Sequence, residues 1–235
     1  MQAGVILRLV SGALQDLEPG LESRWPWESQ GGRIGLLDFL NAAKREIVLQ
    51  RPDLTAVTGP VQLEPGMRQR LPSRRYHNAE KDATMLIDLT RNMGVDGEHP
   101  GPAIVSAQMD ILLAWALPDV TGCVVENYAY DRTVNRDVYY VYPAVTPCCD
   151  VWVEATYSTA PEVITCFTQD IGLPDEYAAA LQHHMLAGVL SGDNESSNAS
   201  KAAYHQQMFA SLLDIKTSVD VSWPKAKSSM VGGAS

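Results

Sequence analysis

The apolar residues of this 235-residue chain change their spacing twice along its length. Helical spacing, in which apolar residues recur every three to four positions, runs through residues 5–17 and 33–51. Short segments typical of β-strands dominate residues 53–167, with one helical stretch at 105–116 among them. Helical spacing then returns at residues 173–189 and 198–216. A chain with this order must build a helical part from both ends and a β part from its middle.

This order predicts an α+β fold with three regions. Residues 1–52 and 168–218 are expected to form one discontinuous four-helix bundle, because an isolated pair of helices buries little apolar surface. Residues 53–167 are expected to form an inserted antiparallel β domain that carries one helix. Residues 219–235 have no apolar period and few large apolar side chains, so they are expected to form an extended C-terminal tail.

The C-terminal tail is expected to become ordered only against a neighbouring copy or another protein. Its anchor is the Trp223-Pro224 pair, because an indole can fill a pocket while proline limits the unbound conformations that binding must give up. The predicted interface residues of the tail are Val221, Trp223, Pro224, Lys225 and Lys227.

The net charge of −10 is concentrated in the middle of the chain, where residues 53–167 carry eight basic and fifteen acidic side chains. An acidic surface repels phosphate, which argues against a protein that grips nucleic acid but is compatible with DNA sliding past. One basic cluster interrupts the acidic region, and it suits a phosphate, an acidic neighbour or a solvated loop. A contact with another subunit is the favoured interpretation for Arg68, Arg70, Arg74 and Arg75, with Lys81 nearby.

The four cysteines match no zinc or thioredoxin-type spacing, so they are interpreted as reduced thiols and no metal is expected. They are Cys123, Cys148, Cys149 and Cys166. No apolar run approaches the roughly 20 residues that a membrane helix needs. Residues 1–16 carry polar side chains throughout and no cleavage site, so a soluble, unexported protein without membrane contact is expected.

The chain shows no phosphate-binding loop, dinucleotide fingerprint, zinc-protease motif or serine-hydrolase motif. A metal-dependent hydrolase would have to use His183, His184, Asp193 and His205, but adjacent histidines on a helix point about 100° apart. A glycan-binding module would use a series of aromatic residues that can stack on sugars. These are Tyr128, Tyr130, Tyr139, Tyr140, Tyr142, Trp152 and Tyr157. The favoured interpretation is a non-enzymatic protein without cofactor, and both alternatives stay open.

Several segments, taken in order, resemble the head-to-tail adaptors of short-tailed bacteriophages, the connectors similar to tail tubular protein A. The opening resembles this family through LLDFLNAAKREI at residues 36–47 and RPD at 51–53, followed by LEPGMRQRLP at 63–72. The likeness continues through DVYYVYP at 137–143, VEATYS at 153–158 and IGLPDEY at 171–177. It spans nearly the whole chain, and none of these segments is catalytic.

The resemblance implies a structural virion protein at the head-to-tail junction, made in the cytoplasm of the bacterial host. Such adaptors form a ring, typically a dodecamer, between the portal and the tail tube or nozzle. Genomic DNA then passes through the channel during packaging and ejection without specific binding. The C-terminal tail is accordingly expected to contact the portal or a neighbouring copy, and the four arginines another subunit or a tail protein. No cofactor is implied.

Overall fold

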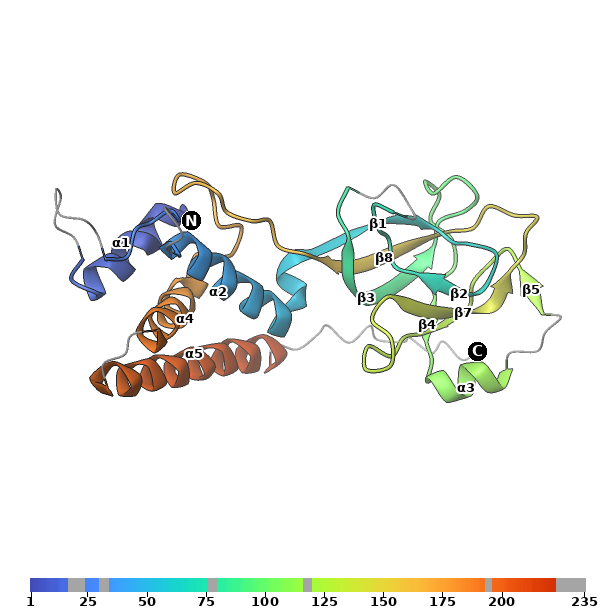
Figure 1. The fold of residues 1–235 in the computed structure, drawn as a ribbon. Coiled ribbons are helices and arrows are strands. Elements are labelled where there is room, and N and C mark those ends of the chain that lie inside the picture. Colours follow the sequence, from blue (N-terminus) through green and yellow to red (C-terminus); the bar gives the residue numbers. More distant parts are fainter. Residues whose placement is uncertain (17–23, 30–33, 76–79, 116–119, 193–195, 223–235) are drawn as a thin grey trace, which may run out of the picture. The chain divides into compact units, whose positions relative to one another are not determined.

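The computed structural model describes residues 1–16, 24–29, 34–75, 80–115, 120–192 and 196–222 (Figure 1). The chain divides into two compact units. The first, called the helical unit, combines Met1–Ile47 with Glu162–Ser235, and the second, called the β unit, is Val48–Pro161.

The helical unit carries four α-helices and the short 3-10 helix η2 (Asp175–Tyr177). The α-helices are α1 (Ala3–Ala13), α2 (Leu36–Gln50), α4 (Ala178–Ser191) and α5 (Ser196–Ser222). In α2 the predicted apolar face is confirmed, because Leu40, Ala43 and Ile47 are fully buried. Helix α1 ends at Ala13, one turn earlier than its apolar spacing predicts, and Gln15 follows with a positive φ of 56°.

The predicted four-helix bundle is wrong. Helices α4 and α5 pack along each other as a hairpin, but α1 contacts α4 over a shorter stretch, and the helices are set at different angles (Figure 1). Their lengths range from 11 residues in α1 to 27 in α5. Since a bundle needs helices aligned within about 20° along a common length, the unit is a mixed assembly of helices and connecting chain.

The chain between the β unit and α4 takes up contacts that the bundle prediction assigned to helices. The backbone oxygen of Phe167 accepts a hydrogen bond from the Gly4 nitrogen of α1 at 2.7 Å. On α2 the Asn41 amide exchanges two hydrogen bonds with the Ile164 backbone, at 2.8 and 2.9 Å. Ile164 and Ile171 are buried. An irregular segment therefore covers part of the apolar surface that helical spacing predicted on α1 and α2.

Helix α5 continues to Ser222, beyond the end near Lys216 that its apolar spacing predicts. Residues 219–222 are therefore helical rather than extended. Their side chains are weak helix formers, but adding residues to an established helix costs little compared with nucleating one. The prediction of an extended C-terminal tail is therefore wrong for residues 219–222, and residues 223–235 lie outside the described residues.

The β unit contains two sheets. A three-stranded antiparallel sheet has the order β1-β8-β3, formed by β1 (Ala56–Gln62), β8 (Trp152–Thr159) and β3 (Ala83–Asn92). The second sheet has the order β2-β7-β6-β4, with β5 also paired to β7. Its strands are β2 (Gly66–Arg70), β7 (Val138–Val145), β6 (Asn127–Ala129), β4 (Val105–Ser106) and β5 (Thr121–Gly122). The β4–β6 and β5–β7 pairings are parallel, so the prediction of a wholly antiparallel domain is wrong.

Side chains from both sheets share one core. Alternate residues of β7 and β8 point into it, and Tyr139, Val141 and Val153 are almost completely buried. The 3-10 helix η1 (Pro52–Thr55) precedes β1, and α3 (Met109–Trp115) lies near β6. Apolar spacing placed Leu112 and Leu113 together on the covered face of α3, but only Leu112 is buried.

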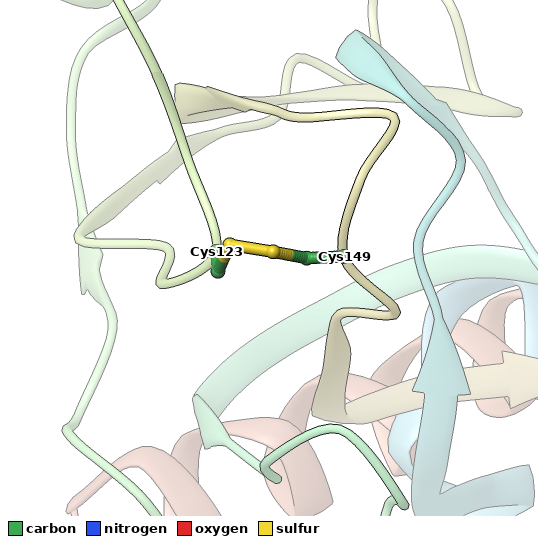
Figure 2. Close-up of a disulfide and its surroundings, with 2 residues drawn as sticks. All are labelled: Cys123 and Cys149. Atoms are coloured by element: carbon green, nitrogen blue, oxygen red, sulfur yellow. A yellow bond between two sulfur atoms is a disulfide. The ribbon is translucent and has the colours of Figure 1, made fainter.

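A disulfide joins Cys123, just after β5, to Cys149 in the turn before β8 (Figure 2). The Cα atoms of the two residues are 5.8 Å apart, inside the usual range for disulfides. Cys148 and Cys166 remain thiols. The prediction of four reduced cysteines is therefore wrong for the Cys123–Cys149 pair.

Candidate functional site

Strand β2 presents two of the predicted contact arginines on one face. Arg68 pairs across to Tyr140 of β7, and Arg70 pairs across to Val138. Gln69 points to the opposite face, where its buried side chain hydrogen-bonds the backbone of Glu64 and Gly66 at 2.7 to 2.9 Å. These bonds close the turn before β2, and strand alternation then places both arginines together on the other face.

Arg74 and Arg75 are exposed in the connection that follows β2. The Arg74 backbone nitrogen donates to Asp82 Oδ1 at 2.8 Å, and its Nε donates to the Glu80 backbone oxygen at 3.0 Å. Ala83, the first residue of β3, donates its backbone N–H to Pro72 at 2.9 Å. These bonds hold Arg74 beside the beginning of β3, near the end of β2 that carries Arg70.

Of the predicted contact residues in the C-terminal tail, the structure describes the backbone of one. Val221 lies in the last turn of α5. Trp223, Pro224, Lys225 and Lys227 lie outside the described residues, so their contacts stay a prediction.

The aromatic series divides between the core and the surface of the β unit. Tyr139 is buried, while its neighbour Tyr140 is half-buried on the opposite face of β7. Tyr128 is also buried, and its hydroxyl donates to Asp88 Oδ1 at 2.8 Å. Burial, with the Asp88 carboxylate as a second cause, raises the pKa of Tyr128 to about 12. These tyrosines therefore do not form one continuous sugar-stacking face.

Of the residues considered for a metal-dependent hydrolase, His183 of α4 and His205 of α5 contact each other, but His184 does not join them. Nδ1 of His183 lies 2.7 Å from Nδ1 of His205, whereas His184 packs its ring against Phe209. Asp193 lies outside the described residues. Within the described parts of the chain, no group of three or more histidine, cysteine or acidic side chains is placed to hold a metal ion.

The His183–His205 pair lines a cavity of about 630 Å³ in the helical unit. The charged side chains that line the same cavity are Asp16, Arg24 and Lys201. Burial lowers the pKa of both imidazoles, and the charge of His183 further lowers the pKa of His205. A single hydrogen bond between two Nδ1 atoms requires one donor and one acceptor, so it is lost when both rings are fully protonated.

Acidification from about pH 7 to about pH 5 is expected to destabilise the helical unit. The pKa values of His183, His184 and His205 are lowered by burial from 6.5, so below that pH the unfolded chain binds more protons than the folded one. The stability that these neutral rings provide is complete above about 6.5 and is lost as the pH falls through their lowered folded pKa values. Thermal unfolding followed by circular dichroism across this range measures the effect.

A double variant with His183→Gln and His205→Gln should lose the part of this pH dependence that these two rings cause, while His184 keeps its own part. His99→Gln, a change of an exposed imidazole in the β unit, should keep it. If the double variant keeps the dependence of the parent protein, the helix-pair histidines are not its source.

Two side chains of α2 bind the chain before α4, and no motif in the sequence indicates these contacts. Lys44 is buried, and its Nζ donates to the Glu162 backbone oxygen at 2.9 Å. Together with the Asn41 amide, it fixes the point where the chain returns to the helical unit. The sequence signal for these contacts was weak, because Ile164 and Glu162, which bind Asn41 and Lys44, lie 123 and 118 residues away along the chain.

Arg68, Arg74 and Arg75 are exposed, so this part of the β unit presents positive charge in an otherwise acidic chain. The chain belongs to the SU10 adaptor protein family, whose model matches residues 1–229. Membership indicates a phage structural adaptor, a non-enzymatic component of the virion that associates with other virion proteins. The predicted resemblance is confirmed at this level, while the assignment to short-tailed phages stays a prediction. No curated protein matches the chain.

Of the helices in the described ranges, none combines the length and the apolar character needed to cross a membrane.

Proposed function

We propose that the protein is a head-to-tail adaptor of a short-tailed phage, and that its copies form a ring, typically of twelve, beneath the portal. The ring joins the portal to the tail tube or nozzle at the head-to-tail junction of a virion assembled in the bacterial cytoplasm. The observation that carries the proposal is the match of an adaptor family model to residues 1–229, nearly the whole chain.

The excess of acidic over basic residues in the chain supports passage of DNA through such a ring. The net charge is −10, and only 18 lysines and arginines stand against 28 acidic residues. Proteins that hold duplex DNA tightly neutralise phosphates with basic side chains and release counterions. A channel wall with few basic groups instead lets the genome move during packaging and ejection without being held.

The C-terminal tail is proposed as the part that docks on the portal. The anchor of the tail directly follows helix α5, because the helix ends at Ser222 and Trp223 is the next residue. An indole followed by proline provides an apolar anchor with little conformational freedom to lose. Lys225 and Lys227 add positive charge beside this anchor.

Deletion of residues 223–235 is expected to abolish measurable binding to portal-containing heads, because it removes the anchor and leaves α5 intact. The substitution Trp223→Ala should weaken binding by at least about tenfold, as for a central aromatic anchor in other interfaces. Cosedimentation of purified protein with heads measures both changes.

The matched control is deletion of residues 230–235, which removes the chain end beyond the family match and keeps Trp223. It should bind like the full chain. Unchanged affinity after deletion of residues 223–235 would rule out the docking role of the tail.

A further inference from the structure

Basic and acidic side chains gather at opposite ends of the β unit. The basic end, defined as Arg70, Arg74, Arg75 and Lys81, surrounds the connection from β2 to β3. The hydrogen bond from Ala83 N to Pro72 O fixes this connection at the first residue of β3. Glu80 and Asp82 lie in the same connection, and Asp137 lies beside it, since its backbone oxygen accepts from Leu71 N at 2.9 Å. The four cations therefore outnumber these three acids by one.

The acidic end lies where β3 finishes and β8 begins, and we define it as Asp96, Glu98 and Asp150. The loop after β3 is held there because Trp152 donates its backbone N–H to Gly94 at 3.2 Å. A Cβ atom on Gly97 would meet the Trp152 ring at 3.0 Å, so this loop lies directly against the first residue of β8. Asp150 accepts a hydrogen bond from Gln62 Nε2 at 3.0 Å, two residues before Trp152.

All three carboxylates of the acidic end are exposed. Hydrogen bonds from the Glu98 backbone and from the His99 imidazole hold the pKa of Asp96 below its usual value, so it is ionised at neutral pH. The acidic end therefore presents stable negative charge to an approaching surface.

Strand β3 separates the two ends. It runs antiparallel to β8, with Ala83 opposite Thr159 and Asn92 opposite Val153. Ten residues of strand span roughly 30 Å, which is nearly four times the screening length of about 8 Å in physiological salt. The second sheet separates the charges in the same way. Arg70 pairs with Val138 at the start of β7, and the chain after Val145, at the end of β7, leads to Asp150.

We propose that the basic end of one copy binds the acidic end of the next, so that the β units associate head to tail. The occupant of each end is a second copy of this chain, since the same molecule carries the complementary charge on its other end. Two different patches that meet in this way make a heterologous contact, the type that closes into rings. The proposal rests on the proposed ring and names the surfaces that contribute to it.

A nucleic acid partner fits these observations less well. The acidic end would repel phosphate, and the basic end has Glu80 and Asp82 among its cations. Charge complementarity between copies uses both ends at once, and it sets the direction of assembly as well as the rate of encounter.

Two charge-reversal variants of the full chain test the contact. The basic-end variant carries Arg74→Glu and Arg75→Glu, and the acidic-end variant carries Glu98→Lys and Asp150→Lys. Each variant then has two ends of the same sign, so each alone should self-associate at least about tenfold more weakly than the parent protein. In an equimolar mixture every end finds an opposite partner, and association should return to within a few-fold of the parent.

Sedimentation velocity at low ionic strength measures the average mass of each sample across concentration. Association of the parent protein should also weaken by about tenfold or more between roughly 50 and 300 mM salt. The control variant carries Arg8→Glu and Arg45→Glu, exposed positions on α1 and α2, and changes the net charge as the basic-end variant does. It should associate like the parent.

The proposal is overturned if the parent stays monomeric at low salt, if the reversed variants associate like the parent, or if their mixture is no stronger than either alone. Binding to portal-containing heads separates this result from the proposed function. If the parent protein and both end variants bind heads equally well, only the proposed contact between the β units is refuted. Parent protein that does not load at all refutes the adaptor role.

Discussion

The substitution Cys149→Ser is expected to lower the free energy of unfolding of the β unit by about 3 kcal/mol. The disulfide closes a loop with a sequence separation of 26 residues, and cross-linking such a loop removes conformations mainly from the unfolded chain. It ties the chain after β5 to the turn before β8, where the backbone adds a hydrogen bond from Thr146 to Gly122 at 3.2 Å. Loss of the bond therefore loosens the turn that leads to the acidic end.

Denaturant unfolding of the parent and of Cys149→Ser, with and without a thiol reductant, measures this effect. The parent in reductant should match the variant, and Cys148→Ser should behave like the oxidised parent because Cys148 is an exposed thiol. Equal stability of the oxidised parent and Cys149→Ser would show that the disulfide does not stabilise the unit. Alkylation of the unfolded chain should label two cysteines in the oxidised parent and four after reduction.

The second large effect is expected for Asn92→Ala, which should destabilise the β unit by about 3 kcal/mol. The buried Asn92 amide donates to Pro102 O at 3.0 Å and to Val125 O at 2.8 Å, and its Oδ1 accepts from Val125 N at 2.8 Å. Val125 is almost completely buried, so truncation leaves its backbone groups without these partners. Most of the cost comes from buried groups that lose a hydrogen bond rather than from the bonds themselves.

The matched control for Asn92→Ala is Asn127→Ala. Asn127 is half-buried, and its amide donates to Val105 O at a longer distance of 3.4 Å. Its loss should cost less than about 1 kcal/mol when the parent and both variants are unfolded in urea. Similar losses for the two variants would contradict the role assigned to the buried amide.

Local patterns in the sequence predicted local structure well. Apolar spacing placed the helices, and the alternation around Gln69 placed Arg68 and Arg70 on one face of a strand. The same spacing could not say what covers an apolar helix face. In the helical unit the irregular chain around Ile164 and Ile171 provides part of that cover, and it has no period that would reveal it.

Contacts between distant residues were the part that sequence reasoning could not predict. The Cys123–Cys149 pairing depends on where two turns meet in space, and the spacing of four cysteines does not determine it. The two parallel strand pairs likewise depend on very short strands whose alternation spans only two or three residues. The separation of basic and acidic ends appears only when β3 and β8 are aligned.

Electron microscopy of the purified protein with and without portal-containing heads tests the adaptor role most directly. An adaptor should appear as a ring of copies, typically twelve, beneath the portal with an open channel on its axis. Density for the C-terminal tail should contact the portal. Heads that carry no ring at saturating protein, or protein bound elsewhere on the virion, would refute the adaptor role.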